Sequence, residues 1–162
     1  MMIIMKSKYV YVFDIDGVLL DVNERFRIAQ NSDNFWRTFF SEELLELDRP
    51  RKIGIEILRD RAQSGLISII TGRPENLRRA TINQLKELNI YRLIWRIIMR
   101  KRNDKRKSYI VKCEALESLI NEGYIVMEVH DDDVEVLIHI RRIFPDIKLF
   151  LHEGESVIEF RY

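Results

Sequence analysis

Five short apolar runs alternate with helical patterns along this chain. This alternation restricts the possible folds more than any other feature of the sequence. The runs are rich in β-branched and aromatic residues and nearly continuous, which is typical of strands covered on both faces. They lie at 9–14, 66–71, 93–99, 124–130 and 147–152. Helical patterns lie at 51–64, 74–88, 107–122 and 133–143. Strands that alternate with helices predict an α/β fold with a parallel sheet and helices on both faces.

Length and composition favour one ordinary globular unit. The 162 residues show no repeat or linker, so we expect a single domain over 1–162. One cysteine, Cys113, excludes an intrachain disulfide and fits a reducing compartment. The apolar start "MMIIM" is too short for a signal peptide or a membrane span. We therefore expect a cytoplasmic protein that does not contact membranes.

Two segments interrupt the alternation. Residues 22–50 come directly after the first strand and predict one or two short helices, an insert that lies over the carboxyl edge of the sheet. The tail 156–162, "SVIEFRY", is compatible with an extra strand or with a segment docked on a neighbour. The sequence leaves these two alternatives open.

Acidic residues gather where the predicted strands end. Asp14 and Asp16 end the first strand, and residues 131–133, all aspartates, end the fourth. The carboxyl ends of parallel strands share one edge, so these carboxylates converge and need a cation. Oxygen ligands favour a hard ion, which predicts Mg²⁺. Residues i and i+2 of an extended segment point the same way, so Asp14 and Asp16 can both face the cleft, and Gly17 leaves room for a turn.

Groups suited to a phosphoryl ligand follow other strands. Thr71 offers a hydroxyl group and Gly72 an unobstructed backbone N–H, both at the end of the second strand. Lys112 shares a helical stripe with Ala115, Leu116 and Leu119, so it faces the sheet near the start of its helix. A lysine there needs a charged partner, and the acidic cleft supplies one. One carboxylate could then attack phosphorus while the other moves the proton of the leaving oxygen.

Each motif also has a purely structural explanation. The pair "DID" can form a turn, "TGR" can be a loop, and "HDDD" can cap a helix that begins there. His130 is expected to be a strand-end histidine whose ring is satisfied by protein partners rather than a metal ligand. The combination of all motifs, in order and each at a predicted strand end, favours the catalytic interpretation.

The motifs "DIDGV" (14–18), "TG" (71–72), "VK" (111–112) and "DD" (131–132) resemble those of the haloacid dehalogenase superfamily of phosphatases. The resemblance implies a three-layer Rossmann-like fold with a central parallel five-stranded sheet and a minimal cap. It implies Asp14 as the nucleophile that forms an aspartyl-phosphate and Asp16 as the general acid and base. It implies that Thr71 and Lys112 bind the phosphoryl group. It also implies Mg²⁺ ligands, namely Asp14, the backbone carbonyl of Asp16, Asp131 and, in one alternative, Asp132.

A narrower resemblance concerns "FWRTFF", "LDRP", "TGRPE" and the basic stretch before Lys112. These segments are similar to the 3′-phosphatase domain of phage-type polynucleotide kinase-phosphatases. The similarity implies that Arg73, Arg100 and Arg106 line the substrate side, with Gly72, and that nucleic-acid 3′ ends are the substrate. The sequence departs from that pattern at Asn103, where a glycine is usual, and at the third acid of 131–133. The sequence therefore leaves undecided, by one position, which of the aspartates 131–133 bind the metal.

Three functions remain in competition on the sequence alone. The first is a Mg²⁺-dependent phosphatase acting on a nucleotide or polynucleotide 3′-phosphate. The second is a phosphatase of a small metabolite or a 5′-nucleotide, and the third is a non-catalytic module that binds phosphate or lipid phosphate. The basic segment 96–107 either follows a phosphate backbone or is a solvated loop. Phe35, Trp36 and Phe39 either pack against the insert or stack on a base.

Overall fold

The structure is a computed structural model that describes residues 7–162. The apolar start "MMIIM" lies outside the described residues. No helix among residues 7–162 combines the length and the apolar character needed to cross a bilayer.

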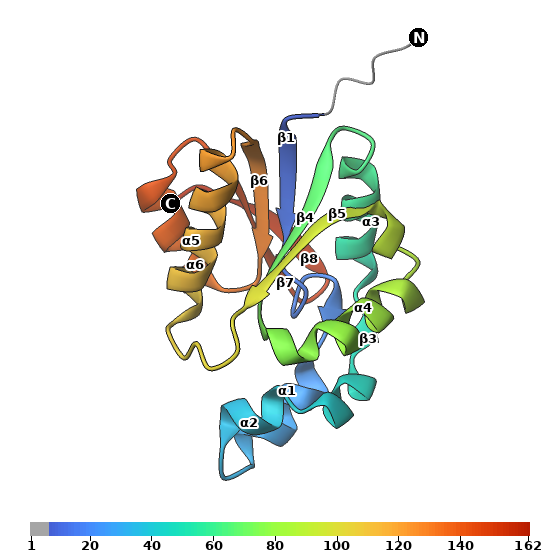
Figure 1. Ribbon diagram of the computed structural model, residues 1–162. Helices are drawn as coiled ribbons and strands as arrows, with labels where there is room; N and C mark the ends of the chain where they lie inside the picture. The colour runs from blue at the N-terminus through green and yellow to red at the C-terminus, as the bar shows by residue number, and fades with distance from the viewer. Residues whose placement is uncertain (1–6) are drawn as a thin grey trace.

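A six-stranded sheet forms the centre of the molecule, in the order β5-β4-β1-β6-β7-β8 (Figure 1). The first five strands in this order are parallel, and β8 pairs antiparallel with β7. Their bounds are β1 Tyr9–Phe13, β4 Leu66–Pro74, β5 Ile94–Arg100, β6 Ile125–Asp131, β7 Lys148–Glu153 and β8 Ser156–Phe160. The expected five parallel strands are present, and the tail adds a sixth by forming a hairpin with β7.

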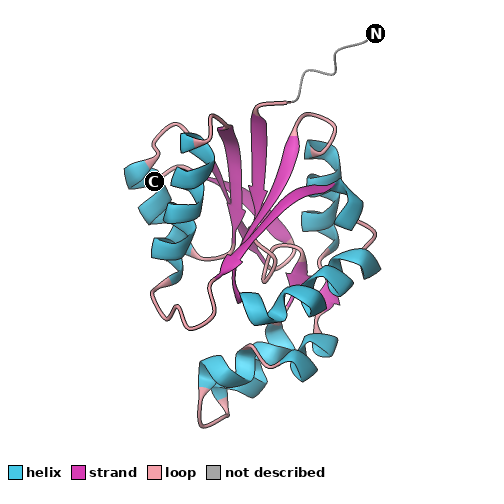
Figure 2. Ribbon diagram, viewed as in Figure 1, coloured by secondary structure: helices cyan, strands magenta, loops and turns pink. Residues whose placement is uncertain are grey.

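Helices cover both faces of the sheet, so the fold has three layers (Figure 2). The helices α3 (Lys52–Arg61) and α4 (Arg78–Glu87) lie on one face, and α5 (Ser108–Asn121) and α6 (Val134–Ile143) lie on the other. Alternation along β1 explains the two cores. Val10 and Val12 pack under α5 and α6, whereas Tyr11 and Phe13 pack under α3 and α4.

The insert after β1 is mostly helical, as its sequence predicts. It contains α1 (Asn23–Gln30), α2 (Phe35–Phe39) and a 3₁₀ segment at Glu42–Leu47. The short strands β2 (Leu20–Asp21) and β3 (Arg49–Pro50) pair antiparallel at its base. Figure 1 shows the insert projecting beyond the carboxyl ends of the sheet strands. Its Leu45 packs with Leu77 and Met99, which ties the insert to α4 and β5.

The segment after β4 differs in detail from the predicted helix over 74–88. Pro74 still belongs to β4, and a 3₁₀ turn at Glu75–Leu77 precedes α4. A second 3₁₀ turn, Tyr91–Leu93, leads into β5. Pro74 has the extended backbone of a strand end, so the regular helix begins four residues after it.

Candidate functional site

Lys112 connects two aspartates that end neighbouring strands. Its Nζ atom lies 2.9 Å from Oδ2 of Asp14, after β1, and 2.6 Å from Oδ2 of Asp131, at the end of β6. All three residues are buried. Burial opposes charge on Lys112, but Asp131 and Asp14 outweigh that effect and hold its pKa above the ordinary value. The convergence of these groups at one sheet edge, as the sequence predicts, is present in the structure.

The position of Lys112 follows from the helix that carries it. α5 buries Val111, Ala115, Leu116 and Leu119 against the sheet, and Lys112 shares this face. Lys112 lies in the second turn, near the end of α5 that faces the acidic edge. Its long side chain can therefore remain packed among apolar neighbours while the ammonium group reaches the carboxylates.

Asp132 completes a group of three carboxylates. One oxygen each from Asp14, Asp131 and Asp132 lies within 4.8 Å of the others. Asp132 is the exposed member of this group, but the protein packed around its carboxylate, followed by the charges of Asp131 and Asp14, raises its pKa. Burial, opposed in part by Lys112 and reinforced by Asp131, raises the pKa of Asp14 to about 7. One ammonium group does not balance three crowded carboxylates, so this cluster fits a metal cation.

The structure distinguishes between the three consecutive aspartates that the sequence leaves open. Asp131 and Asp132 belong to the cluster around Asp14. Asp133 is instead the N-cap of α6, where its side chain accepts a hydrogen bond of 2.9 Å from the N–H of Glu135. The third acid therefore has the capping role that "HDDD" also allows.

Asp16 points to a different environment from Asp14. Its Oδ1 atom accepts hydrogen bonds from Nη2 of Arg25 at 2.8 Å and from Nη2 and Nε of Arg73 at 2.7 and 3.1 Å. Within residues 7–162, its Oδ2 atom has only one long contact, 3.4 Å from Nε of Arg73. Burial alone would raise the pKa of Asp16, but the two guanidinium groups outweigh it and lower that pKa. The arrangement favours the ionised form of Asp16 and engages Oδ1 more strongly than Oδ2.

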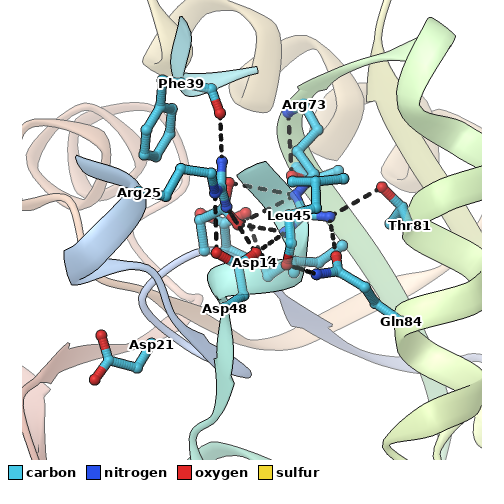
Figure 3. Close-up of polar contacts among 12 residues, drawn as sticks. Asp14, Asp21, Arg25, Phe39, Leu45, Asp48, Arg73, Thr81 and Gln84 are labelled. Atoms are coloured by element: carbon cyan, nitrogen blue, oxygen red, sulfur yellow. Dashed lines mark hydrogen bonds and ion pairs between the residues drawn. The ribbon is translucent and has the colours of Figure 1, made fainter. Parts of the chain in front are cut away.

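Both arginines are held in turn by Asp48, at the end of the insert (Figure 3). Asp48 accepts from Nε of Arg25 at 2.9 Å and from Nη2 of Arg73 at 3.2 Å. Arg25 also donates to the carbonyl of Phe39, and its guanidinium lies 4.2 Å from the centre of the Phe39 ring. Both arginine side chains and the side chain of Asp48 are completely buried. The insert thus contributes directly to the surroundings of Asp16.

Helix α4 supplies the remaining partners of Arg73. Its Nη1 atom donates to Oγ1 of Thr81 at 3.0 Å and to Oε1 of Gln84 at 2.6 Å, as Figure 3 shows. Gln84 donates to the carbonyl of Leu45, in the insert, at 2.9 Å. Arg73 is therefore fixed from three sides, by the loop after β1, the insert and α4.

Thr71 and Gly72 lie at the same edge, near the end of β4. Thr71 is buried, and its hydroxyl oxygen accepts from the N–H of Arg73 at 3.2 Å, which leaves the hydroxyl proton to donate elsewhere. A Cβ atom on Gly72 would lie 3.0 Å from Oγ of Ser108, at the start of α5. A side chain here would require the Ser108 hydroxyl to shift slightly, so glycine allows the strand end and the helix to approach closely without that shift.

A known protein family matches most of the chain. The sequence model described as "Polynucleotide kinase PNKP phosphatase domain" matches residues 8–146. The chain belongs to this family. It is a phosphatase domain of the polynucleotide kinase-phosphatase type.

Solved structures show the same fold in this PNKP-type phosphatase domain and its relatives. "Structure of Pnkp1/Rnl/Hen1 complex" contains a chain with a TM-score of 0.69 and 23% identity, over 91% of our chain and 46% of that one. "Structure of the Pnkp1/Rnl/Hen1 RNA repair complex" gives a TM-score of 0.69 and 24% identity, over 90% and 42%. A haloacid dehalogenase-like family hydrolase, SP0104 from Streptococcus pneumoniae, gives 0.63 and 13%, over 89% and 83%.

These structures confirm the Rossmann-like haloacid dehalogenase fold that the sequence predicts. The PNKP-type domain spans less than half of the length of the two Pnkp1/Rnl/Hen1 chains. Among curated proteins, none gives a significant match.

Two arginines that the family resemblance assigns to the substrate side already have hydrogen-bond and ion-pair partners within the protein. Arg100 donates through Nε to the carbonyl of Gly72 at 3.0 Å and through Nη1 to the carbonyls of Asp104 and Arg106. Arg106 pairs with Asp104 at 2.9 Å and with Glu114 at 2.6 Å. Arg73, the third, faces Asp16 and is fully buried. In the structure, Arg100 and Arg106 hold the loop that follows β5, and Arg73 holds Asp16.

The aromatic residues of the insert form one cluster with unequal exposure. Phe39 is buried beneath Arg25, and Phe35 stacks against it with ring centres 5.4 Å apart. Trp36 stacks on Phe40 but is 64% exposed. Packing accounts for Phe35 and Phe39, whereas Trp36 keeps an open face.

Both ring nitrogens of His130 have hydrogen-bond partners within the protein, as the sequence predicts. It stacks between Phe13 and Phe150, with ring centres 4.3 and 4.7 Å away. Its Nδ1 lies 2.9 Å from Nε2 of His152, and its Nε2 lies 2.8 Å from the carboxylate of Glu128. Arg51 can only donate, so its contact of 2.6 Å with Nδ1 of His152 orients the whole chain toward Glu128. The two histidines therefore link β6, β7 and the start of α3.

Arg25 and Asp48 are functional candidates that sequence reasoning missed. Arg25 shares the buried stripe of α1 with Ala29, and a charged residue on such a stripe is the signal that could have identified it. Asp48 belongs to the "LDRP" segment, which carried a family resemblance but no assigned role. Neither signal names a partner, because the contacts are made between distant segments.

Proposed function

We propose that this chain is a Mg²⁺-dependent phosphomonoesterase that removes a 3′-phosphate from a nucleotide or polynucleotide through an aspartyl-phosphate on Asp14. The observation that carries the proposal is the arrangement around two aspartates. Asp14 lies beside Lys112 at 2.9 Å, whereas Asp16, two residues later, is held by two guanidinium groups. These different surroundings support different roles for the two carboxylates, attack for Asp14 and proton transfer for Asp16.

In the first half of the reaction, a carboxylate oxygen of Asp14 bonds to phosphorus while the bond from phosphorus to the 3′ oxygen breaks. Asp16 gives its proton to the leaving oxygen. In the second half, ionised Asp16 takes a proton from water, whose oxygen bonds to phosphorus and releases inorganic phosphate and free Asp14. The lowered pKa of Asp16 favours the ionised form, which this second half requires. The first half uses the minor protonated form, which a lowered pKa makes the stronger proton donor.

Lys112 and Thr71 are the candidates to bind the phosphoryl oxygens. Lys112 supplies positive charge from a buried position, and Thr71 supplies its free hydroxyl proton. Asp14, Asp131, Asp132 and the backbone carbonyl of Asp16 would hold Mg²⁺. Bound there, the ion would neutralise charge on the phosphoryl oxygens and on the crowded carboxylates. The raised pKa values of Asp14 and Asp132 support such a cation, because ionised Asp14 is the nucleophile.

Two observations support a nucleic-acid end as the substrate. The family match names a polynucleotide kinase phosphatase domain, and two related solved structures are named for a Pnkp1/Rnl/Hen1 complex, one of them called an RNA repair complex. The insert is also short, which leaves access for a long substrate, whereas small-metabolite phosphatases more often close over their ligand.

The direct test is a panel of phosphoesters with and without Mg²⁺. It includes an oligonucleotide with a 3′-phosphate, the same oligonucleotide with a 5′-phosphate, a nucleoside 3′-monophosphate and sugar phosphates. We expect release of phosphate from the 3′-phosphorylated substrates only, and only with the metal. Selective turnover of 5′-nucleotides or sugar phosphates would favour the metabolite alternative instead.

The intermediate is tested separately. An oligonucleotide labelled with ³²P at its 3′-phosphate is mixed with excess protein, and the reaction is quenched in acid. We expect label on the protein, and we expect hydroxylamine to release that label. D14N should abolish both labelling and turnover, while D16N should bind the oligonucleotide normally but turn over at least about 100-fold more slowly. Full labelling of D14N would rule out Asp14 as the nucleophile.

A further inference from the structure

The loop between β5 and α5 is the most basic segment at the catalytic edge. Residues 101–107 contain five cationic side chains and one acidic side chain. Figure 1 shows this loop extending past the carboxyl end of β5, on the same side of the sheet as the insert. Its position and charge require an explanation, because the edge beside it is crowded with carboxylates.

Both ends of this loop meet Gly72, a candidate for binding the phosphoryl group. Arg100, just before the loop, donates to the carbonyl of Gly72 at 3.0 Å. Ser108, just after the loop, places its Oγ atom 3.0 Å from where a Cβ of Gly72 would lie. Nη2 of Arg100 also lies 3.4 Å from Oγ of Ser108. The loop therefore begins and ends beside Gly72, which directly follows Thr71.

Arg100 and Arg106 give the loop a defined shape. Arg100 donates to two carbonyl groups within it, those of Asp104 and Arg106. The side chain of Asp104 accepts from the N–H and the guanidinium of Arg106, contacts that lower its pKa to about 2. Asn103 adopts a left-handed backbone with φ of 70°. The loop is thus held from inside, and these two arginines are used in doing so.

Three of the four remaining cations of the loop are unpaired within the described residues. Lys101, Arg102 and Lys105 are exposed, and none of them forms an ion pair with any residue of the described part of the chain. Lys107, by contrast, lies 3.6 Å from a carboxylate oxygen of Glu135. Three uncompensated charges on a shaped loop are thus available to an external anion.

We propose that Lys101, Arg102 and Lys105 bind the phosphodiester backbone of a polynucleotide, next to the nucleotide whose 3′-phosphate occupies the site. The inference rests on the proposed function and adds to it a binding surface for the strand that carries the 3′-phosphate. A polyanion that approaches Asp14, Asp131 and Asp132 needs positive charge along its path. The 3₁₀ segment of the insert exposes Glu42, Glu43 and Glu46, so the basic loop is the favourable side.

The test compares two triple variants that remove the same charge. The loop variant is K101A/R102A/K105A. The control variant is R92A/R142A/K148A, whose residues are exposed and lie before β5, at the end of α6 and at the start of β7, away from the catalytic edge. Binding is measured by fluorescence anisotropy with a labelled single-stranded oligonucleotide that ends in a 3′-hydroxyl, over a series of KCl concentrations.

We expect the loop variant to bind at least about tenfold more weakly, and its plot of log Kd against log salt to be less steep by about two, since each single-strand phosphate contact contributes about 0.7. The control variant should match the unmodified protein. In turnover assays, kcat/KM for the 3′-phosphorylated oligonucleotide should fall relative to that for a nucleoside 3′-monophosphate in the loop variant only.

The outcomes separate this inference from the proposed function. Equal binding and equal salt dependence in the two variants would overturn the role of the loop, even if the 3′-phosphate is hydrolysed normally. Loop-dependent binding without any hydrolysis of the 3′-phosphate would overturn the proposed reaction and leave the binding surface in place.

Discussion

Arg73 reaches Asp16 through two of its nitrogen atoms, with Nη2 at 2.7 Å and Nε at 3.1 Å from the same oxygen, Oδ1. The two residues are far apart in the sequence, and Arg73 is completely buried. This contact leaves Oδ2 of Asp16 with a single long partner in the described part of the chain. The arginine that follows the "TG" motif therefore orients the proposed acid and base.

Replacing Arg73 with lysine should reduce kcat by about 100-fold with little change in KM, because an ammonium group cannot reproduce the two-pronged contact. The measurement is steady-state kinetics on the 3′-phosphorylated oligonucleotide. R78K is the matched control, because Arg78 makes a similar pair with Glu75 nearby, at the surface. If R73K raises KM alone, Arg73 binds the substrate instead of orienting Asp16.

Asp48 should be important for stability as well as for activity. It is the shared partner of Arg25 and Arg73, and its side chain is fully buried. D48N would leave two buried guanidinium groups with a single carboxylate, at a cost of about 3–5 kcal/mol in the free energy of unfolding. Urea unfolding measures this. D60N removes an exposed ion pair with Arg61 and should cost about 1 kcal/mol or less; similar losses in both variants would contradict the prediction.

Lys112 should be indispensable for turnover. K112A removes the only ammonium group that contacts both Asp14 and Asp131 in the described structure, so we expect kcat to fall at least about 1,000-fold. K107A, which removes a lysine five residues earlier that pairs weakly with Glu135, should retain activity. Near-normal rates in K112A would mean that Lys105 or Lys107 has the role assigned to Lys112.

Gly17 should be required for metal binding. Its φ is +79°, and a Cβ atom there would lie 2.0 Å from Oδ2 of Asp132. G17A should therefore displace Asp132 and raise the Mg²⁺ concentration for half-maximal activity at least about tenfold. Mg²⁺-induced thermal stabilisation gives a readout independent of activity. G123A has the same type of backbone strain with no atom within 4 Å, so it should lower stability without changing the Mg²⁺ requirement.

The histidine pair should make stability depend on pH. Burial, followed by the charges of His130 and Arg51, lowers the pKa of His152 to about 3. The unfolded chain binds a proton below about pH 6.5 and the folded chain does not, so stability is complete above that pH and falls as the pH decreases toward 3. The loss from His152 at pH 5 should be roughly 2 kcal/mol.

Urea unfolding at pH 7.5, 6 and 5 checks this sign and size. H152Q should be less stable than the unmodified protein at pH 7.5, because it loses the contact with Arg51. Its stability should nevertheless decline less between pH 7.5 and pH 5. Parallel decline in both proteins would show that His152 is not the group responsible.

The sequence by itself determined the features that depend on local periodicity. The apolar runs indicated the five parallel strands, the helical stripe placed Lys112 toward the sheet, and the strand ends placed Asp14, Thr71 and Asp131 at one edge. These inferences succeed because strand and helix periods alone decide which side chains share a face or an edge.

Tertiary structure alone decided the orientation of individual side chains. It assigned Asp133 to a helix cap, Arg73 to Asp16, and Arg100 to the basic loop, and it paired the tail with β7. Arg25, Asp16 and Asp48 come from three segments that meet only after the insert folds over the sheet. Such contacts depend on the charge and space that distant segments bring together, and no local pattern in the chain encodes them.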